Sequence, residues 1–153
     1  MKNRFVLSLW AIALVLFAGC ESTSFTDRLD AIPPQVKTVD GELSDVSLAA
    51  QKAFKRLDFR LTRATIGRVE AATAIKTSET FGDSRQTVAR VKITPAESGK
   101  CEVELTVTEE VGSASMGGTH RQELREHSLF ALYFTTLQQV LGEAAAEQAA
   151  EKK

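Results

Sequence analysis

The sequence predicts a two-layer α+β domain in which two helices cover one face of an antiparallel sheet of four to five strands, in the order β-α-β-β-β-β-α. Three observations predict this fold class. Two stretches of the chain carry apolar residues at helical spacing, and between them apolar residues alternate with a period of two. The chain has 153 residues, of which 43% are hydrophobic, so one modest core is expected.

Residues 1–19 have the composition of a secretory signal peptide. Lys2 and Arg4 precede an apolar run over residues 5–17 that only Ser8 interrupts. The run is shorter than the roughly 20 apolar residues that span a bilayer. We therefore expect residues 1–19 to direct export and then to be removed.

The four residues that close this segment are Phe17-Ala18-Gly19-Cys20, which resemble a bacterial lipobox with Phe17 in place of the usual Leu. The resemblance implies that Cys20 is diacylated on its sulfur (diacylglycerol), becomes the new N-terminus and is then acylated on its amine, as with palmitate. Such chains anchor a protein firmly without a transmembrane helix. The alternative is a simple membrane anchor or a buried helix in which Cys20 has no role.

The residue after the cysteine is Glu21. In enteric bacteria an aspartate at this position resembles an inner-membrane retention signal, so its absence favours the periplasmic face of the outer membrane, with the inner membrane as the alternative. Without Lys2 and Arg4 the mature chain has 17 basic and 20 acidic residues, a net charge of −3. Cys101 is then the only thiol without a lipid, which excludes an intramolecular disulfide.

The remaining chain divides into three parts. Residues 20–35 form a lipidated tether that ends in Pro33-Pro34, residues 36–141 form the α+β domain, and residues 142–153 form a flexible or helical tail.

The first half of the domain reads as a short strand and a helix. Val39 and Leu43 flank Gly41 on one face of the strand, and Ser44 or Asp45 can cap the helix that follows. The helix spans residues 46–57, with its apolar positions at the i, i+3, i+4, i+7 spacing. The period changes to two at residue 58, and Phe59 and Leu61 point inward before a turn at Gly67.

Three longer strands follow, each with one inward set of alternating residues. The inward sets are Val69, Ala71, Thr73 and Ile75; Thr87, Ala89, Val91 and Ile93; and Cys101, Val103, Leu105 and Val107.

Turns at Gly82-Asp83 and between Pro95 and Gly99 make these strands two hairpins. Pairing Ile93 with Cys101 places opposite charges face to face, and the other hairpin pairs Val91 with Ala71. The expected charge contacts are Lys92 with Glu102, Arg90 with Glu104, and Glu70 with Lys92. The charged stripe is interpreted as a solvated sheet face, with a binding surface as the alternative.

A loop of small residues over 111–119 precedes the second predicted helix, which spans residues 120–141 and is capped by Thr119. Its apolar stripe is broad around Phe130 to Phe134, so we expect it to cover the sheet and to offer a surface to a partner.

The helix-to-strand passage over residues 49–61, Ala-Ala-Gln-Lys-Ala-Phe-Lys-Arg-Leu-Asp-Phe-Arg-Leu, resembles a group of small bacterial envelope lipoproteins of unknown function. The order of elements is similar to the helix-grip modules in the C-subunit lipoprotein of the outer-membrane β-barrel assembly machinery. The resemblance implies an accessory interaction module without chemistry. This chain has one such module where that lipoprotein has two, and no functional residue carries over.

Three groups of residues are candidates for chemistry. His120, Glu123 and His127 could present metal ligands on one face of the predicted helix, although ordinary i, i+4 pairing is the preferred interpretation. Cys101 could be a reactive thiol, but a buried small apolar side chain is preferred. Residues 113–117 resemble a nucleophile elbow in which Ser113 replaces the first glycine, and no buried parallel strand precedes them. We therefore predict no enzyme, no metal and no cofactor.

Charge is distributed unevenly. Residues 45–68 contain six basic residues against two acids, and residues 97–126 contain seven acids against three basic residues. The basic part could contact anionic lipid headgroups, or the two parts could complement one another within the fold. Nucleic acid is not an expected partner of an exported chain with one tyrosine and no aromatic strip.

These observations predict a membrane-anchored envelope lipoprotein that acts as a binding or scaffolding module for an envelope partner. One alternative is a periplasmic enzyme that uses a metal or a thiol. Another is a structural lipoprotein joined to peptidoglycan through the terminal Lys152-Lys153.

Overall fold

A computed structural model describes residues 32–151 except residues 81, 98 and 114–117. The chain divides into two units, and the described part belongs to the second, Ile32–Lys153. In chain order its elements are β1 (Gln35–Asp40), α3 (Leu43–Arg56), β2 (Arg60–Thr65), β3 (Arg68–Ala72), β4 (Lys76–Thr77), β5 (Ser84–Pro95), β6 (Lys100–Ser113), β7 (Gly118–Glu123) and α4 (Ser128–Glu151).

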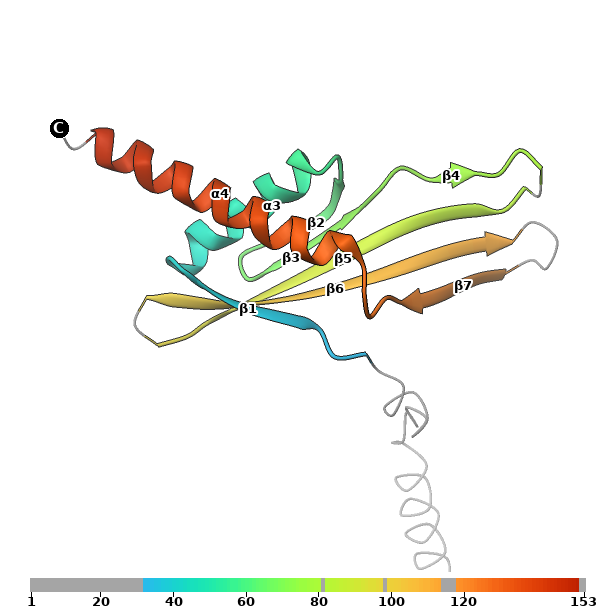
Figure 1. The fold of residues 1–153 in the computed structure, drawn as a ribbon, viewed down its shortest axis with the longest axis horizontal. Coiled ribbons are helices and arrows are strands. Elements are labelled where there is room, and N and C mark those ends of the chain that lie inside the picture. The colour runs from blue at the N-terminus through green and yellow to red at the C-terminus, as the bar shows by residue number, and fades with distance from the viewer. Residues whose placement is uncertain (1–31, 81, 98, 114–117, 152–153) are drawn as a thin grey trace, which may run out of the picture. The chain divides into compact units, whose positions relative to one another are not determined.

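The strands form one antiparallel sheet in the order β1-β6-β5-β3-β2, with β4 paired to β5 and β7 paired to β6. Both helices lie on the same face of this sheet and pack against each other (Figure 1). The predicted α+β fold class is therefore confirmed. The five-stranded path matches the expected strand number, and β4 and β7 are the strands that the sequence analysis did not predict.

The helix α3 forms where the apolar spacing predicts it, but it begins earlier. It starts at Leu43 instead of Val46, after an N-cap at Glu42 that makes no side-chain capping hydrogen bond. The predicted caps Ser44 and Asp45 were therefore wrong, as was the placement of Leu43 in a strand. Leu43 packs against the core, and this contact stabilises an additional turn at the start of the helix.

The largest error concerns residues 120–127, which were predicted to open the second helix, and residues 118–119, which were predicted to belong to the loop before it. Residues 118–123 instead form β7 and pair with β6 from Thr108 to Ser113. The helix α4 begins only at Ser128, after His127. The polar stretch from His120 to Glu123 has no apolar helical face to bury, whereas the long edge of β6 offers it a full set of backbone hydrogen bonds.

The helix α4 then continues through Gly142 to Glu151, so most of the tail, residues 142–153, is helical. A helix was one of the two states predicted for this tail.

Arg56 of α3 binds Glu143 of α4, with Nη1 and Oε1 3.0 Å apart. This bond raises the pKa of Arg56 and lowers the pKa of the Glu143 carboxyl. Both side chains are exposed, so the pair adds little stability.

Both predicted hairpins form, but each predicted register was wrong by two residues. Ile93 pairs with Val103, not Cys101, so that Lys92 lies opposite Glu104. Gly99 adopts a left-handed conformation with φ of 69°, and this centres the turn one residue later than predicted.

In the other hairpin Val91 pairs with Val69, not Ala71, and Glu70 lies opposite Arg90. Residues 73–75 leave the ladder between β3 and β4, which changes the register and leaves Ile75 exposed instead of inward. A shift of two residues keeps every side chain on its predicted face, so the inward sets remain otherwise valid.

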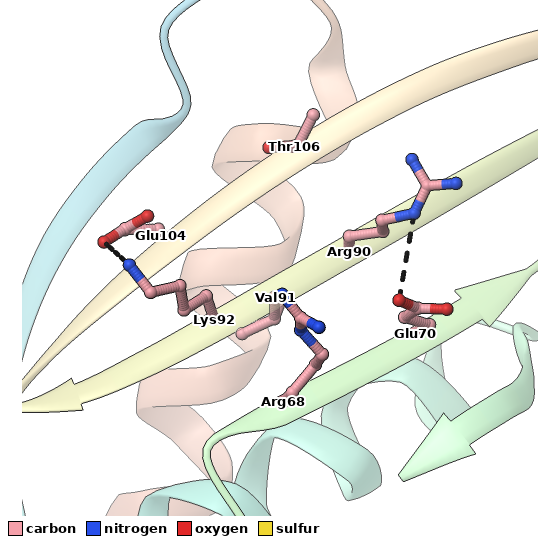
Figure 2. A pocket seen from close by; sticks show the side chains of 7 residues that line it. All are labelled: Arg68, Glu70, Arg90, Val91, Lys92, Glu104 and Thr106. Carbon is pink, nitrogen blue, oxygen red and sulfur yellow. Dashed lines mark hydrogen bonds and ion pairs between the residues drawn. The ribbon is translucent and has the colours of Figure 1, made fainter. Parts of the chain in front are cut away.

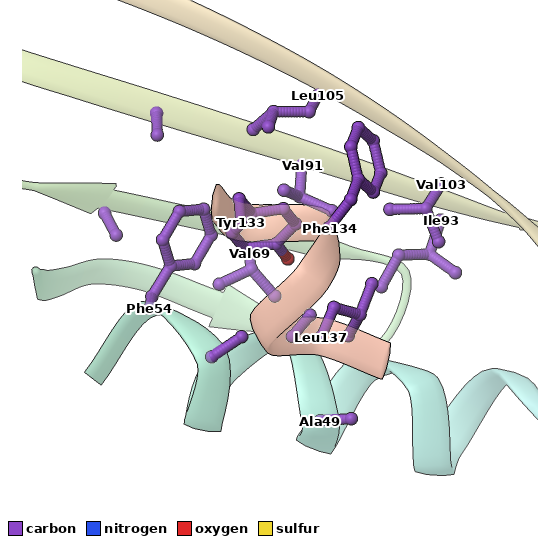
Figure 3. Packing of buried hydrophobic residues seen from close by; sticks show 14 of the residues in the cluster. Ala49, Phe54, Val69, Val91, Ile93, Val103, Leu105, Tyr133, Phe134 and Leu137 are labelled. Carbon is purple, nitrogen blue, oxygen red and sulfur yellow. The ribbon is translucent and has the colours of Figure 1, made fainter. Parts of the chain in front are cut away.

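The core lies between the helices and the inner face of the sheet (Figure 3). The helices contribute Phe54, Tyr133, Phe134 and Leu137, and the central strands contribute valine, leucine and isoleucine side chains. Phe54 lies at the centre, with its ring centroid 4.6 Å from Tyr133 and 5.6 Å from Phe59. The predicted apolar surface around Phe130 to Phe134 is thus mainly core, and only Leu132 of its large side chains is exposed.

Tyr133 carries a polar atom into this core. Its side chain is fully buried, and its hydroxyl has no hydrogen-bond partner among the described residues. Burial raises the pKa of this phenol far above its ordinary value, so it stays protonated. We expect Tyr133→Phe to raise the free energy of unfolding by about 1 kcal/mol, because it removes an unsatisfied buried group and keeps the ring. Urea unfolding measures the change, and a loss of stability would contradict it.

Candidate functional site

The predicted metal ligands do not meet. His120 and Glu123 lie three residues apart on the strand β7, so they point to opposite faces of the sheet. His127 lies beyond the strand, where its Nδ1 accepts a hydrogen bond from the backbone N–H of Leu129 at 3.1 Å. His127 therefore caps α4. Within the described part of the chain, no three His, Cys, Asp or Glu side chains are grouped as metal ligands.

Cys101 is the small buried side chain that the preferred interpretation expected. It lies on β6 in the core, and its Sγ donates to the carbonyl oxygen of Gly41 at 3.4 Å. Burial raises the pKa of the thiol, which lowers the fraction of reactive thiolate. The arrangement disfavours thiol chemistry at this residue.

Other predicted features lie outside the described residues. These are the signal peptide, the lipobox with Cys20, most of the tether, residues 114–117 of the elbow-like stretch, and the terminal Lys152-Lys153. Among the described residues, no helix is both long and apolar enough to cross a membrane.

The basic part of the sequence separates into two groups in the fold. Lys52, Lys55 and Arg56 lie on the exposed side of α3. Arg60, Arg63 and Arg68 lie on β2 and β3. The strand pairings place this second group on the sheet face opposite the helices, since Arg63 pairs with Glu70 and the neighbouring Leu61 pairs with the buried Ala71.

Five basic side chains meet on this open sheet face. Arg90 and Lys92 of β5 lie on the same face, because they pair with Glu70 and Arg68 of β3. The five are Arg60, Arg63, Arg68, Arg90 and Lys92, and we call them the basic face. Glu70 is the one acid on this face in β2, β3 and β5, and the next strand, β6, adds Glu104 across from Lys92.

A shallow hollow of roughly 390 Å³ lies within the basic face, over β3, β5 and β6. Figure 2 shows the guanidinium of Arg68 between two ion pairs. On one side Arg90 Nε lies 4.0 Å from Glu70 Oε1, and on the other Lys92 Nζ lies 3.0 Å from Glu104 Oε1. The floor is the backbone of β5 at Val91.

Three members of the basic face lack a partner. Arg60, Arg63 and Arg68 are exposed and make no ion pair with any side chain that the structure describes. Among the described residues, no ion pair joins one of the six basic residues from 45–68 to an acid from 97–126. A guanidinium binds phosphate and carboxylate oxygens through two donors at once. The basic face can therefore bind an anion.

Two grooves on the helix side are weaker candidates. One lies between α3 and α4, with roughly 330 Å³, and its cations face Glu143 and Glu147 across the groove. The other lies between β1 and α4, with roughly 300 Å³, and is lined by short polar and apolar side chains with Asp40 as its one charged residue. Neither gathers unpaired charges of one sign.

The comparisons with known proteins do not assign this chain to a family. No protein-family model matches it, and no curated protein matches it. Among solved structures it is similar to the adenylate sensor from AMP-activated protein kinase, crystallised in complex with 5-aminoimidazole-4-carboxamide 1-beta-D-ribofuranotide, at 12% sequence identity. The alignment covers 66% of this chain and 93% of that one with a TM-score of 0.40, a likeness too low to carry an argument.

The six basic residues are visible in the sequence, but their division between two faces was not predicted. Alternation in β2 could have indicated it, since Arg60 and Leu61 must point to opposite sides of the sheet. An irregularity between Leu61 and Arg63 then returns Arg63 to the side of Arg60. Strict alternation with Arg60 would have placed Arg63 on the inner face.

Proposed function

We propose that this protein is a lipid-anchored lipoprotein of the bacterial envelope, and that its domain is a binding module for a negatively charged partner. The anchor rests on the lipobox-like residues Phe17-Ala18-Gly19-Cys20 after a short apolar run. The binding role rests on one observation: Arg60, Arg63 and Arg68 lie on the sheet face opposite the helices and make no ion pair with the described residues.

The anchor is tested by labelling the full chain in bacteria with an alkyne analogue of palmitate. The chain has two cysteines, so Cys101→Ala is a matched control for Cys20→Ser. We expect the wild type and Cys101→Ala to be labelled and to sediment with membranes. Cys20→Ser is expected to lose the label, and a label that survives in Cys20→Ser would contradict the anchor.

The binding role is tested in the same cells by a photocrosslinking side chain at position 63, with position 55 on α3 as the control. Both positions carry an exposed basic residue, one on each layer of the fold. We expect a reproducible adduct from position 63 that is absent from position 55. Equal adducts from both positions, or none from either, would contradict a binding role for the basic face.

A further inference from the structure

The turn between β2 and β3 exposes an apolar side chain at the edge of the basic face. Ile66 lies at this turn, and its side chain is 74% exposed, the highest value among the exposed large hydrophobic residues described. Its strand neighbours Arg63 and Arg68 are two of the three unpaired arginines. A single exposed isoleucine is common on protein surfaces, so the feature that distinguishes this turn is its combination with two arginines.

This turn is held firmly, so the exposure of Ile66 does not come from a loose loop. The backbone N–H of Gly67 donates to Ser47 Oγ on α3 at 3.0 Å, and the N–H of Ile93 donates to the Gly67 carbonyl at 2.8 Å. Ser47 is itself buried and donates to the carbonyl of Leu43 at 2.6 Å. Bonds to α3 and to β5 thus fix the direction in which Ile66 projects.

We propose that this turn docks the domain on an anionic phospholipid surface, with Ile66 entering the boundary between headgroups and acyl chains while Arg63 and Arg68 bind lipid phosphates. This deepens the proposed function and rests on it for the presence of a membrane near the domain. Long arginine side chains reach phosphates while an adjacent apolar residue enters the bilayer. A soluble anion would use the arginines but would leave Ile66 in water, and this difference favours a membrane.

The charge of the sheet sets the orientation on such a surface. The cations of β2 and β3 lie at one side of the open face, whereas Glu102, Glu104 and Glu110 lie on β6. A negatively charged membrane attracts the first side and repels the second. Docking through the β2–β3 turn therefore holds the domain at a defined tilt, which a lipid anchor alone does not impose.

The test places a single tryptophan at the turn of the full chain. Trp10 is the only natural tryptophan, so Trp10→Phe removes the background, and Cys20→Ser removes lipidation. Ile66→Trp is then compared with Ile75→Trp, which is also exposed but follows the other end of β3. The probes are vesicles of phosphatidylcholine alone or mixed with phosphatidylglycerol, with brominated acyl chains as quenchers.

With the mixed vesicles we expect tryptophan 66 to shift its emission to the blue and to be quenched by the brominated chains, and tryptophan 75 to stay solvent-exposed. With phosphatidylcholine alone both are expected to remain exposed. Arg63→Glu together with Arg68→Glu is expected to lower the partition constant on the mixed vesicles at least about 25-fold, because each arginine near an anionic surface contributes roughly fivefold. Lys52→Glu with Lys55→Glu makes the same charge change on α3 and is expected to leave most of the signal.

The proposal would be overturned by no quenching at position 66, by equal quenching at positions 66 and 75, or by equal losses from the two charge reversals. Quenching that is the same with and without phosphatidylglycerol would also overturn it. The labelling of Cys20 and the crosslinks at position 63 are measured separately, so this proposal can fail while the anchored binding module stands.

Discussion

Phe54→Ala is expected to lower the free energy of unfolding by about 3–5 kcal/mol, the range for removing a large aromatic side chain from a packed core. Phe54 is fully buried and lies between Tyr133 of α4 and Phe59 at the entry to β2. Replacing Phe54 with alanine removes the ring contacts that join α3 to α4 and to the start of β2. A domain of this size has a total stability of roughly 5–15 kcal/mol, so the variant is expected to lose a large share of it.

Urea unfolding followed by far-ultraviolet circular dichroism measures the change. Leu132→Ala is the matched control, because it removes a similar volume from the same layer at a side chain that is 52% exposed. The control is expected to stay within about 0.5 kcal/mol of the wild type. Similar losses from both variants would show that Phe54 is not at the centre of the core.

Gly67→Ala is expected to destabilise the protein by about 2–3 kcal/mol, since two separate costs add at this residue. Gly67 has a φ of +81°, where a side chain is strained. A Cβ built there would lie 3.2 Å from the carbonyl oxygen of Ile93, a backbone atom of the neighbouring strand β5 that cannot easily move. Two hydrogen bonds resist any shift of the turn: the Gly67 N–H donates to Ser47 Oγ, and the Gly67 carbonyl accepts from the Ile93 N–H.

Gly99→Ala separates the two costs. Gly99 has a similar φ of +69°, but a Cβ there lies more than 4 Å from every described residue beyond its chain neighbours. This control is expected to cost about 1 kcal/mol, the conformational part alone. Thermal unfolding of both variants gives the comparison, and equal losses would contradict a steric contact at Gly67. The Gly67 variant is also expected to weaken docking through Ile66, because the turn that presents it must move.

The side-chain pattern predicted which faces of the strands are inward but not which residues lie opposite one another. The residues two positions before and after Val91 and Val103 are also apolar. A register shifted by two residues therefore buries the same kinds of side chain. The turns decided the registers instead. Gly99 required the left-handed conformation at one turn, and residues 73–75 left the ladder before the other.

The second helix shows where apolar periodicity fails as a guide. Its true start at Ser128 follows a histidine cap, which is uncommon among capping residues, whereas Thr119 is a favourable cap in sequence terms. The strand β7 is polar on both faces, so no pattern of side chains could reveal it. Its stability comes from backbone pairing with β6, which depends on β6 extending as far as Ser113.

The candidate site was predicted only as composition. The excess of positive charge in residues 45–68 is visible in the sequence, but its division between α3 and the open sheet face depends on the irregularity in β2. Arg90 and Lys92 come from a strand more than 20 residues away and join the basic face only through the register of β3 with β5. Local pattern does not determine such long-range placement.

The hairpin of β5 and β6 extends past the helix-covered core to the pairs from Ser84–Gly112 to Val88–Thr108, flanked there by β4 and β7 (Figure 1). Because this end is built from backbone pairing, inserting or deleting two residues on each strand keeps every remaining side chain on its face. The far end of the hairpin can therefore change length over evolution without repacking the interior. Related chains are expected to differ in length there and to keep the β2–β3 turn constant, since that turn is tied to α3.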